Sequence, residues 1–102
     1  MQAVFISDIH GNLEALRAVE ATLPDAPIYC LGDVVGYGAN PNEVVEWVRE
    51  RCEVCILGNH DLAVLTGDVS WFNPAAAKAI RWTRSVIKPE NLSFLADLAD
   101  RA

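Results

Sequence analysis

Three short polar segments of the sequence combine residue types that bind divalent metal ions. They read DIHGN at 8–12, GD at 32–33 and GNHD at 58–61. Together they offer carboxylate oxygens, imidazole nitrogens and a carboxamide oxygen, a mixed set that suits manganese, iron, zinc or nickel better than a sulfur-preferring ion. The candidate site residues are Asp8, His10, Asp33, Asn59, His60 and Asp61.

Each polar segment follows a short apolar run that is rich in β-branched residues. The runs are AVFIS at 3–7, IYCL at 28–31 and EVCIL at 53–57. Because they show little alternation, they are typical of strands in a parallel sheet that is covered on both faces. Ligands bind at the carboxyl edge of such a sheet, so we expect the three polar segments to converge there. Asp33 alone follows the central strand, which makes it the expected bridge between two metal ions.

Helical patterns separate the predicted strands. Apolar residues recur at helical spacing over 12–23 and are followed by a proline. In the second helix, Asn40 is the expected N-cap, Pro41 the first helical residue and Glu43 the partner in a capping box. Its expected buried stripe comprises Val44, Val45, Val48 and Cys52. The predicted fold class is therefore α/β, a parallel sheet with flanking helices in the order β-α-β-α-β.

A helical tail is predicted after residue 61. The segment NPAAAKAIRWTRSV repeats the Asn-Pro helix start at Asn73 and Pro74, and another helix begins near Pro89. We interpret residues 1–102 as a single domain, and a chain of this length buries about two-thirds of its unfolded surface. Three parallel strands are few for such a sheet, so we expect the chain to be the N-terminal part of a larger domain.

The candidate residues also have purely structural interpretations. Asp8 or Asn12 could cap the first helix, and Asp33 could be a turn residue beside glycine. Asn59 or Asp61 could cap the following segment DLAVL. However, both histidines of the chain lie in the three polar segments, and no such segment lies at the opposite edge of the predicted sheet. Their joint placement favours a shared site over separate structural roles.

The composition excludes several classes of function. The chain of 102 residues has a formal net charge of -6 and no run of Lys or Arg that could follow a nucleic-acid backbone or an anionic membrane. It has no apolar run long enough to span a membrane and no signal-peptide pattern, so we expect a cytoplasmic protein. Cys30, Cys52 and Cys55 lie in or beside apolar runs and are interpreted as buried thiols, because a zinc ribbon would need a second C-x-x-C pair.

The order D-x-H, G-D and G-N-H-D, each after a strand, resembles the calcineurin-like metallophosphoesterase superfamily. The longer sequence segments around these motifs are similar to those of a bacterial branch of small phosphodiesterases and phosphatases. These segments are SDIHGNLEAL, LGDVVGYGANPNE, LGNHD and FNPAAAKAIRWTR. This resemblance covers nearly the whole chain. It implies the N-terminal half of a four-layer αββα fold and hydrolysis of a small phosphomonoester or phosphodiester by a water activated by two metal ions. Manganese is the expected metal, with iron, zinc or nickel as alternatives.

The resemblance also implies a role for each candidate residue. Asp8 and His10 would bind the first metal, Asp33 would bridge both, and Asn59 would bind the second and lie at the substrate. His60 would contact the phosphoryl group and assist the leaving oxygen, and Asp61 would orient His60 by a hydrogen bond.

Family members supply further metal-binding histidines from a second half, and this chain has no histidine after His60. Either a missing C-terminal segment or self-association is therefore expected to complete the structure. The alternative is a non-catalytic fragment or interaction module that keeps the fold without a complete metal site. Among the aromatic residues, Tyr37 is expected either to stack on a leaving group or to pack its own loop. Trp71, Phe72 and Trp82 are expected in a core or an interface.

Overall fold

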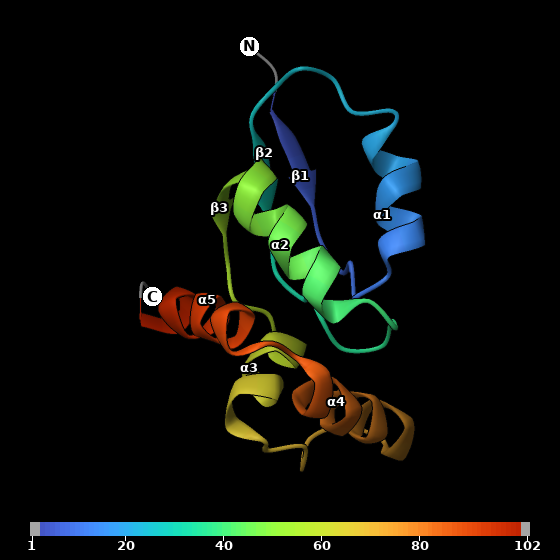
Figure 1. The fold of residues 1–102 in the computed structure, drawn as a ribbon, viewed down its shortest axis with the longest axis vertical. Coiled ribbons are helices and arrows are strands. Elements are labelled where there is room, and N and C mark those ends of the chain that lie inside the picture. Colours follow the sequence, from blue (N-terminus) through green and yellow to red (C-terminus); the bar gives the residue numbers. More distant parts are fainter. Residues whose placement is uncertain (1–2, 101–102) are drawn as a thin grey trace.

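The computed structural model describes residues 3–100, which form three strands and five helices (Figure 1). The strands β1 (Val4–Ile6), β2 (Ile28–Cys30) and β3 (Cys52–Cys55) form a parallel sheet in the order β1-β2-β3. The helices are α1 (Leu13–Glu20), α2 (Pro41–Arg51), α3 (Asn59–Thr66), α4 (Pro74–Val86) and α5 (Pro89–Asp100). The predicted α/β class and element order are confirmed. Of the helices described, none has the length and apolar character needed to cross a membrane.

Two of the three predicted asparagine caps act on the backbone. Asn12 accepts a hydrogen bond from the Ala15 N–H at 3.0 Å, and Asn73 accepts one from the Ala76 N–H at 2.8 Å. The predicted capping box of α2 is not formed, because Asn40 makes no side-chain bond to the helix backbone. Its carboxamide instead donates to Glu43 Oε2 at 3.3 Å, since a carboxamide carries donors that a carboxylate can accept.

The core is one buried cluster that extends from the sheet and the helices α1 and α2 to α3, α4 and α5. Leu16 of α1, Cys30 of β2 and the stripe Val44, Val45 and Val48 of α2 belong to the same buried cluster. Cys52, expected at the end of that stripe, instead begins β3 and is half-buried. Its place in the strand follows from the end of α2 at Arg51.

The opposite face of the sheet is exposed, so the prediction of strands covered on both faces is wrong for this chain. Phe5, Tyr29 and Val54 are partners across the three strands, and the rings of Phe5 and Tyr29 stack with centroids 5.5 Å apart. Phe5 is 64% and Val54 54% exposed. The physical reason is topological: with the strands in sequential order, two right-handed crossovers place both helices on one face.

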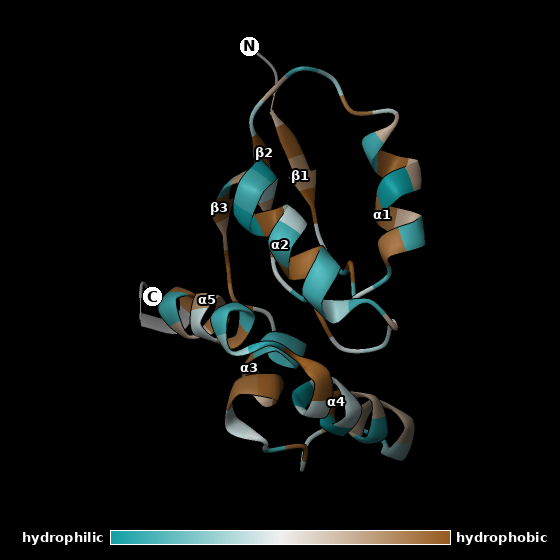
Figure 2. Ribbon diagram, viewed as in Figure 1, coloured by the Kyte–Doolittle hydropathy of each residue, from teal (hydrophilic) through white to brown (hydrophobic). Residues whose placement is uncertain are grey.

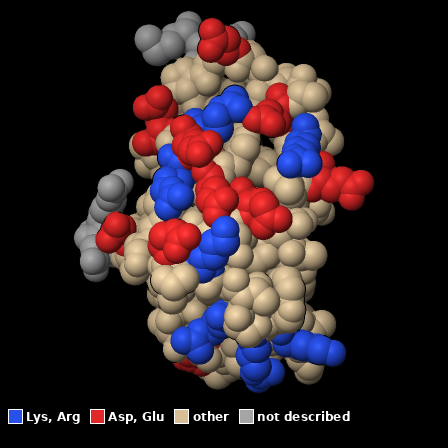
Figure 3. Space-filling view, in the orientation of Figure 1, with Lys and Arg blue, Asp and Glu red and all other residues tan. Residues whose placement is uncertain are grey.

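The helices α3, α4 and α5 pack together beyond the carboxyl ends of the strands (Figure 1). Each of these helices carries apolar residues (Figure 2), and Val64, Ile80 and Leu95 are completely buried in one cluster. Asn42 of α2 joins this group to the sheet unit, because its Oδ1 accepts from the Lys88 N–H at 2.8 Å. Acidic and basic side chains are mixed over the upper part of the surface, and basic side chains gather at the lower end (Figure 3).

Candidate metal centre

Backbone hydrogen bonds hold the segments that follow β1 and β2 side by side. The Asp8 N–H donates to the Gly32 carbonyl at 3.1 Å, and the His10 N–H donates to the Asp33 carbonyl at 2.9 Å. These bonds continue the pairing of the two parallel strands beyond their ends. As a result, the first two polar segments of the sequence lie next to each other at the carboxyl edge of the sheet.

Three of the candidate residues have a left-handed backbone. Their φ angles are 59° at Asp8, 52° at His10 and 54° at Asp33, and no other non-glycine residue in 3–100 has a positive φ. Asp and His tolerate this region better than most residues, but it still costs free energy and persists only where surrounding contacts impose it. Such residues cluster at functional sites, which favours a shared site over isolated capping roles.

His10, Asp33 and His60 converge in one place. One potential ligand atom of each residue lies within 4.8 Å of those of the other two. His60 Nδ1 lies 3.5 Å from Asp33 Oδ1, and the two imidazole rings lie with centroids 4.6 Å apart. Asp8 adjoins this group through its Oδ1, 3.4 Å from His10 Nε2. Four of the six candidate residues are therefore neighbours although they come from all three polar segments.

The histidine nitrogens suit a cation or a phosphoryl group. His10 Nδ1 lies 3.3 Å from the Val35 carbonyl. A carbonyl only accepts, so in the tautomer in which Nδ1–H donates to Val35, Nε2 keeps a lone pair for a metal ion. Both ring nitrogens of His60 are buried, and neither has a hydrogen-bond partner within the described residues. Buried polar atoms are rarely left unpaired, so the residues present fit a bound metal ion or an oxyanion at this point.

Glycines allow the close approach of the segments. A Cβ atom at Gly36 would lie 2.9 Å from His60 Cδ2, and one at Gly58 would overlap the nitrogen and the carboxylate of Asp33. The third polar segment can therefore reach Asp33 only because position 58 lacks a side chain.

The expected hydrogen bond from Asp61 to His60 is not formed. The Asp61 carboxylate is completely buried, and its two oxygens accept from the backbone N–H groups of Val35 and Gly58, each at 3.0 Å. Burial raises the pKa of Asp61, and the backbone hydrogen bonds oppose that rise. Neither ring nitrogen of His60 has a hydrogen-bond partner within the described residues, so Asp61 binds the backbone of the segments that carry the site and makes no bond to the His60 ring.

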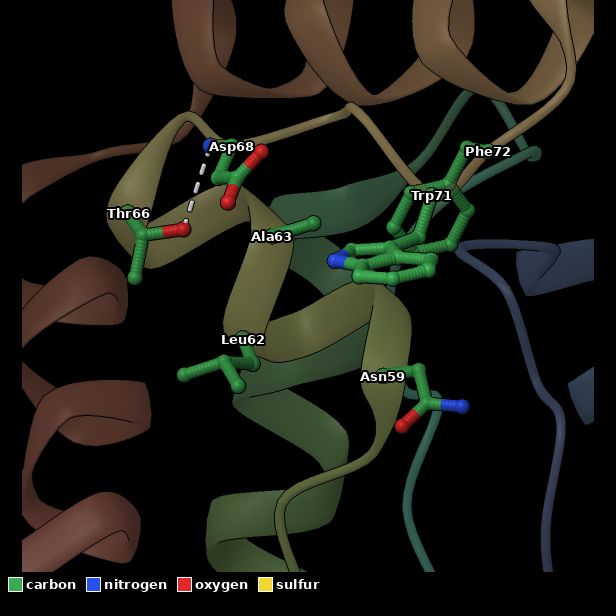
Figure 4. A pocket seen from close by; sticks show the side chains of 7 residues that line it. All are labelled: Asn59, Leu62, Ala63, Thr66, Asp68, Trp71 and Phe72. Atoms are coloured by element: carbon green, nitrogen blue, oxygen red, sulfur yellow. Dashed lines mark hydrogen bonds between the residues drawn. The ribbon is translucent and has the colours of Figure 1, made fainter.

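Asn59 lies at the first position of α3 and is exposed. Its side chain lines a cavity of about 460 Å³ together with Trp71 and Phe72 (Figure 4). The metal-binding role of Asn59 stays a prediction.

Aromatic side chains enclose the two histidines. Tyr37 lies 5.3 Å from the His10 ring and 5.2 Å from the His60 ring, and Phe72 lies 5.0 Å from His60 on another side. Phe72 packs against the buried core, as expected from its sequence context, and is in addition a neighbour of the site. Trp71 does not lie in a core, because it is 92% exposed.

Ser7 is a further neighbour that sequence reasoning missed. Its hydroxyl donates to Asp8 Oδ2 at 2.8 Å, and this bond is the main reason that the pKa of Asp8 lies below its usual value. The bond therefore favours the ionised carboxylate, which is the form that a metal ligand requires. A serine directly before the first aspartate was the available signal.

Comparison with known proteins identifies relatives of this arrangement. The sequence model described as calcineurin-like phosphoesterase matches residues 1–100. An uncharacterised protein of Methanocaldococcus jannaschii, MJ0912, is 53% identical over 97 residues, which cover 91% of this chain and 40% of that protein. The crystal structure of a metallophosphoesterase from Sphaerobacter thermophilus is 40% identical with a TM-score of 0.82, covering 96% of this chain and 41% of that one.

A more distant likeness concerns the fold alone. A putative diadenosine tetraphosphatase is 23% identical with a TM-score of 0.65, over 94% of this chain and 42% of its own length. This chain therefore spans about two-fifths of the length of the relatives it matches. The match over residues 1–100 shows that the chain belongs to the calcineurin-like phosphoesterases.

Proposed function

We propose that the intact protein containing this chain hydrolyses a small phosphomonoester or phosphodiester with the help of two divalent metal ions, of which manganese is the expected one. The observation that supports this most directly is the convergence of His10, Asp33 and His60 at the carboxyl edge of the sheet. The two nitrogens of the His60 ring add to it, because they are buried without a hydrogen-bond partner within the described residues.

In this proposal Asp8 and His10 would hold the first metal, Asp33 would be a ligand of both, and Asn59 would contribute to the second. Two divalent cations, when bound at such a site, neutralise the charge of the phosphate and lower the pKa of a water molecule that they bind. Their charge also offsets the local carboxylates, which would otherwise repel an anionic ester. The site therefore needs metal before it can attract its substrate.

The protein's own side chains supply orientation and proton transfer. His60 approaches the site from α3, and neither ring nitrogen has a hydrogen-bond partner within the described residues, so it can contact the phosphoryl group and give a proton to the leaving oxygen. Tyr37 and Phe72 pack on its ring and limit its movement. Asp61 ties the segments after β2 and β3 together and so keeps His60 in position relative to Asp33.

The number of protein ligands in this chain is small for two metals. The sequence contains two histidines, and both are already part of the group. The remaining ligands are proposed to come from the part of the relatives' length that this chain does not span, and the exposed face of the sheet is proposed to be covered by that part or by a second copy. We also propose a cytoplasmic location.

The experiment is a comparison of metal content and hydrolysis. The intact protein and the 102-residue chain are each dialysed against manganese, assayed for bound metal and tested on an aryl phosphate and an aryl phosphodiester. The proposal expects metal-dependent hydrolysis by the intact protein and weaker metal binding by the chain alone. A well-folded intact protein that binds no metal would favour the alternative of a non-catalytic interaction module.

A further inference from the structure

A cavity lies beside the candidate metal centre, and the proposed function does not assign it a ligand. It lies between α3 and the segment that leads into α4, and its volume is about 460 Å³ (Figure 4). Two of its residues connect it to the site: Asn59 directly precedes His60, and Phe72 packs on the His60 ring with centroids 5.0 Å apart. The cavity is therefore adjacent to Asn59, which is proposed to bind metal and substrate, and lies across the Phe72 ring from His60.

Among the residues that line the cavity, Trp71 carries a large aromatic side chain that contributes little to the packing of the chain. Its side chain is 92% exposed, and no aromatic or cation contact involves it within the described residues. The indole lies along the cavity wall between α3 and Phe72 (Figure 4). A tryptophan that buries so little of itself contributes little to folding, and its flat apolar face is suited to stacking on a planar group.

The rest of the lining indicates the charge of the molecule that would fit. Leu62 and Ala63 of α3 are apolar, and Thr66 offers a hydroxyl whose oxygen already accepts from the Asp68 N–H. The only charged lining residue is Asp68, which is negative and accepts from the Ser70 hydroxyl and N–H. A second phosphate would be repelled here, whereas an uncharged ring with N–H or O–H donors would not.

We propose that this cavity binds the planar, uncharged organic group of the phosphate ester, an aryl or nucleobase ring that stacks on Trp71 while the phosphate lies at His60. This inference rests on the proposed function and adds the class of substrate to it. Tyr37, the other exposed aromatic residue near the site, is already packed on both histidine rings, which leaves Trp71 as the stacking surface.

The test measures binding without turnover. The affinities of naphthyl phosphonate and methylphosphonate for the intact, manganese-loaded protein are determined by calorimetry in the wild type and in Trp71→Ala. We expect the wild type to prefer the naphthyl compound, and Trp71→Ala to reduce the ratio of the two affinities by about 5- to 100-fold, the range that base stacking on aromatic side chains produces. Trp71→Phe, which keeps a planar ring, should restore most of the ratio.

The matched control is Trp82→Ala, since Trp82 is a partly exposed tryptophan of α4 that does not line the cavity. It should leave the ratio unchanged. A wild-type ratio near one, or a ratio that Trp71→Ala does not alter, overturns the inference while methylphosphonate binding still supports the phosphate site. If neither phosphonate binds in the presence of manganese, the proposed function fails and this inference fails with it.

Discussion

Asp33 Oδ1 accepts a hydrogen bond from the backbone N–H of His60 at 3.0 Å, although 27 positions separate the two residues. The bond joins the segment after the central strand to the first turn of α3. It also holds the Asp33 carboxylate close to the ring nitrogens of His10 and His60. The residue expected to bridge two metals is thus the one that fixes the third polar segment against the second.

Replacement of His60 separates proton donation from metal binding. In the intact protein, His60→Gln should keep most of the bound metal and reduce turnover of esters with poor leaving groups by about 10²- to 10⁴-fold, the scale for loss of a positioned acid. An ester with a good leaving group needs little protonation and should be affected less. Parallel rate measurements on phenyl and 4-nitrophenyl esters, with metal analysis, check this. Metal loss on this substitution would make His60 a ligand.

A methyl group at position 58 should disturb the site without any backbone strain. Gly58 has φ -89° and ψ 175°, which alanine adopts readily, but its Cβ would overlap Asp33. Overpacking of this kind typically costs about 1–3 kcal/mol, so Gly58→Ala should lower the free energy of unfolding by that amount in urea titrations. It should also weaken metal binding. Wild-type stability together with wild-type metal affinity would show that the close approach of Gly58 to Asp33 is not required.

The thiol of Cys52 should be unreactive in the folded chain. Burial raises the pKa of Cys52 to about 12, so its reactive thiolate is scarce at neutral pH. Alkylation of Cys52 by iodoacetamide at pH 8 should therefore be slow in the native chain and fast in guanidinium, and the native rate should rise with pH towards that pKa. Mass spectrometry of the labelled peptide provides the readout. Native labelling as fast as that of the unfolded chain would argue against a packing role.

The exposed face of the sheet should cause the isolated chain to associate. Phe5, Val54 and Ile56 are all more than half exposed, and contiguous apolar surface of this kind is normally covered. We expect sedimentation velocity to detect dimers or larger species of the 102-residue chain and Val54→Lys to reduce them. Val86→Lys on α4 serves as the control, because Val86 is exposed elsewhere. A monomeric wild-type chain at high concentration contradicts this expectation.

The placement of the site at the sheet edge could be predicted because each polar segment directly follows an apolar strand. Asn12 and Asn73 could likewise be predicted as caps, since both precede a helical pattern. These are relationships between residues close in sequence. The partners of Asp61 could not be predicted, because Val35 lies 26 positions away and its N–H is available only after the segments have packed.

The exposure of the sheet face and of Trp71 could not be predicted from the sequence for a similar reason. The apolar runs of the strands indicate burial but not which partner buries each face, and both connecting helices lie on one face in this topology. An aromatic residue in a helical tail is equally compatible with a core and with a surface. Only the three-dimensional arrangement puts Phe72 against His60 and Trp71 along the neighbouring cavity.

The most direct test of the account is the manganese content of the intact protein with Asp33→Asn. An asparagine can still accept the His60 N–H, so the fold is expected to persist, but the bridging charge is lost. We predict two manganese ions per chain in the wild type and in the exposed control Asp25→Asn, measured by equilibrium dialysis and mass spectrometry. Asp33→Asn should lose affinity by more than about 100-fold, beyond the effect of residues that only support metal ligands. Wild-type metal content in folded Asp33→Asn would contradict the central claim.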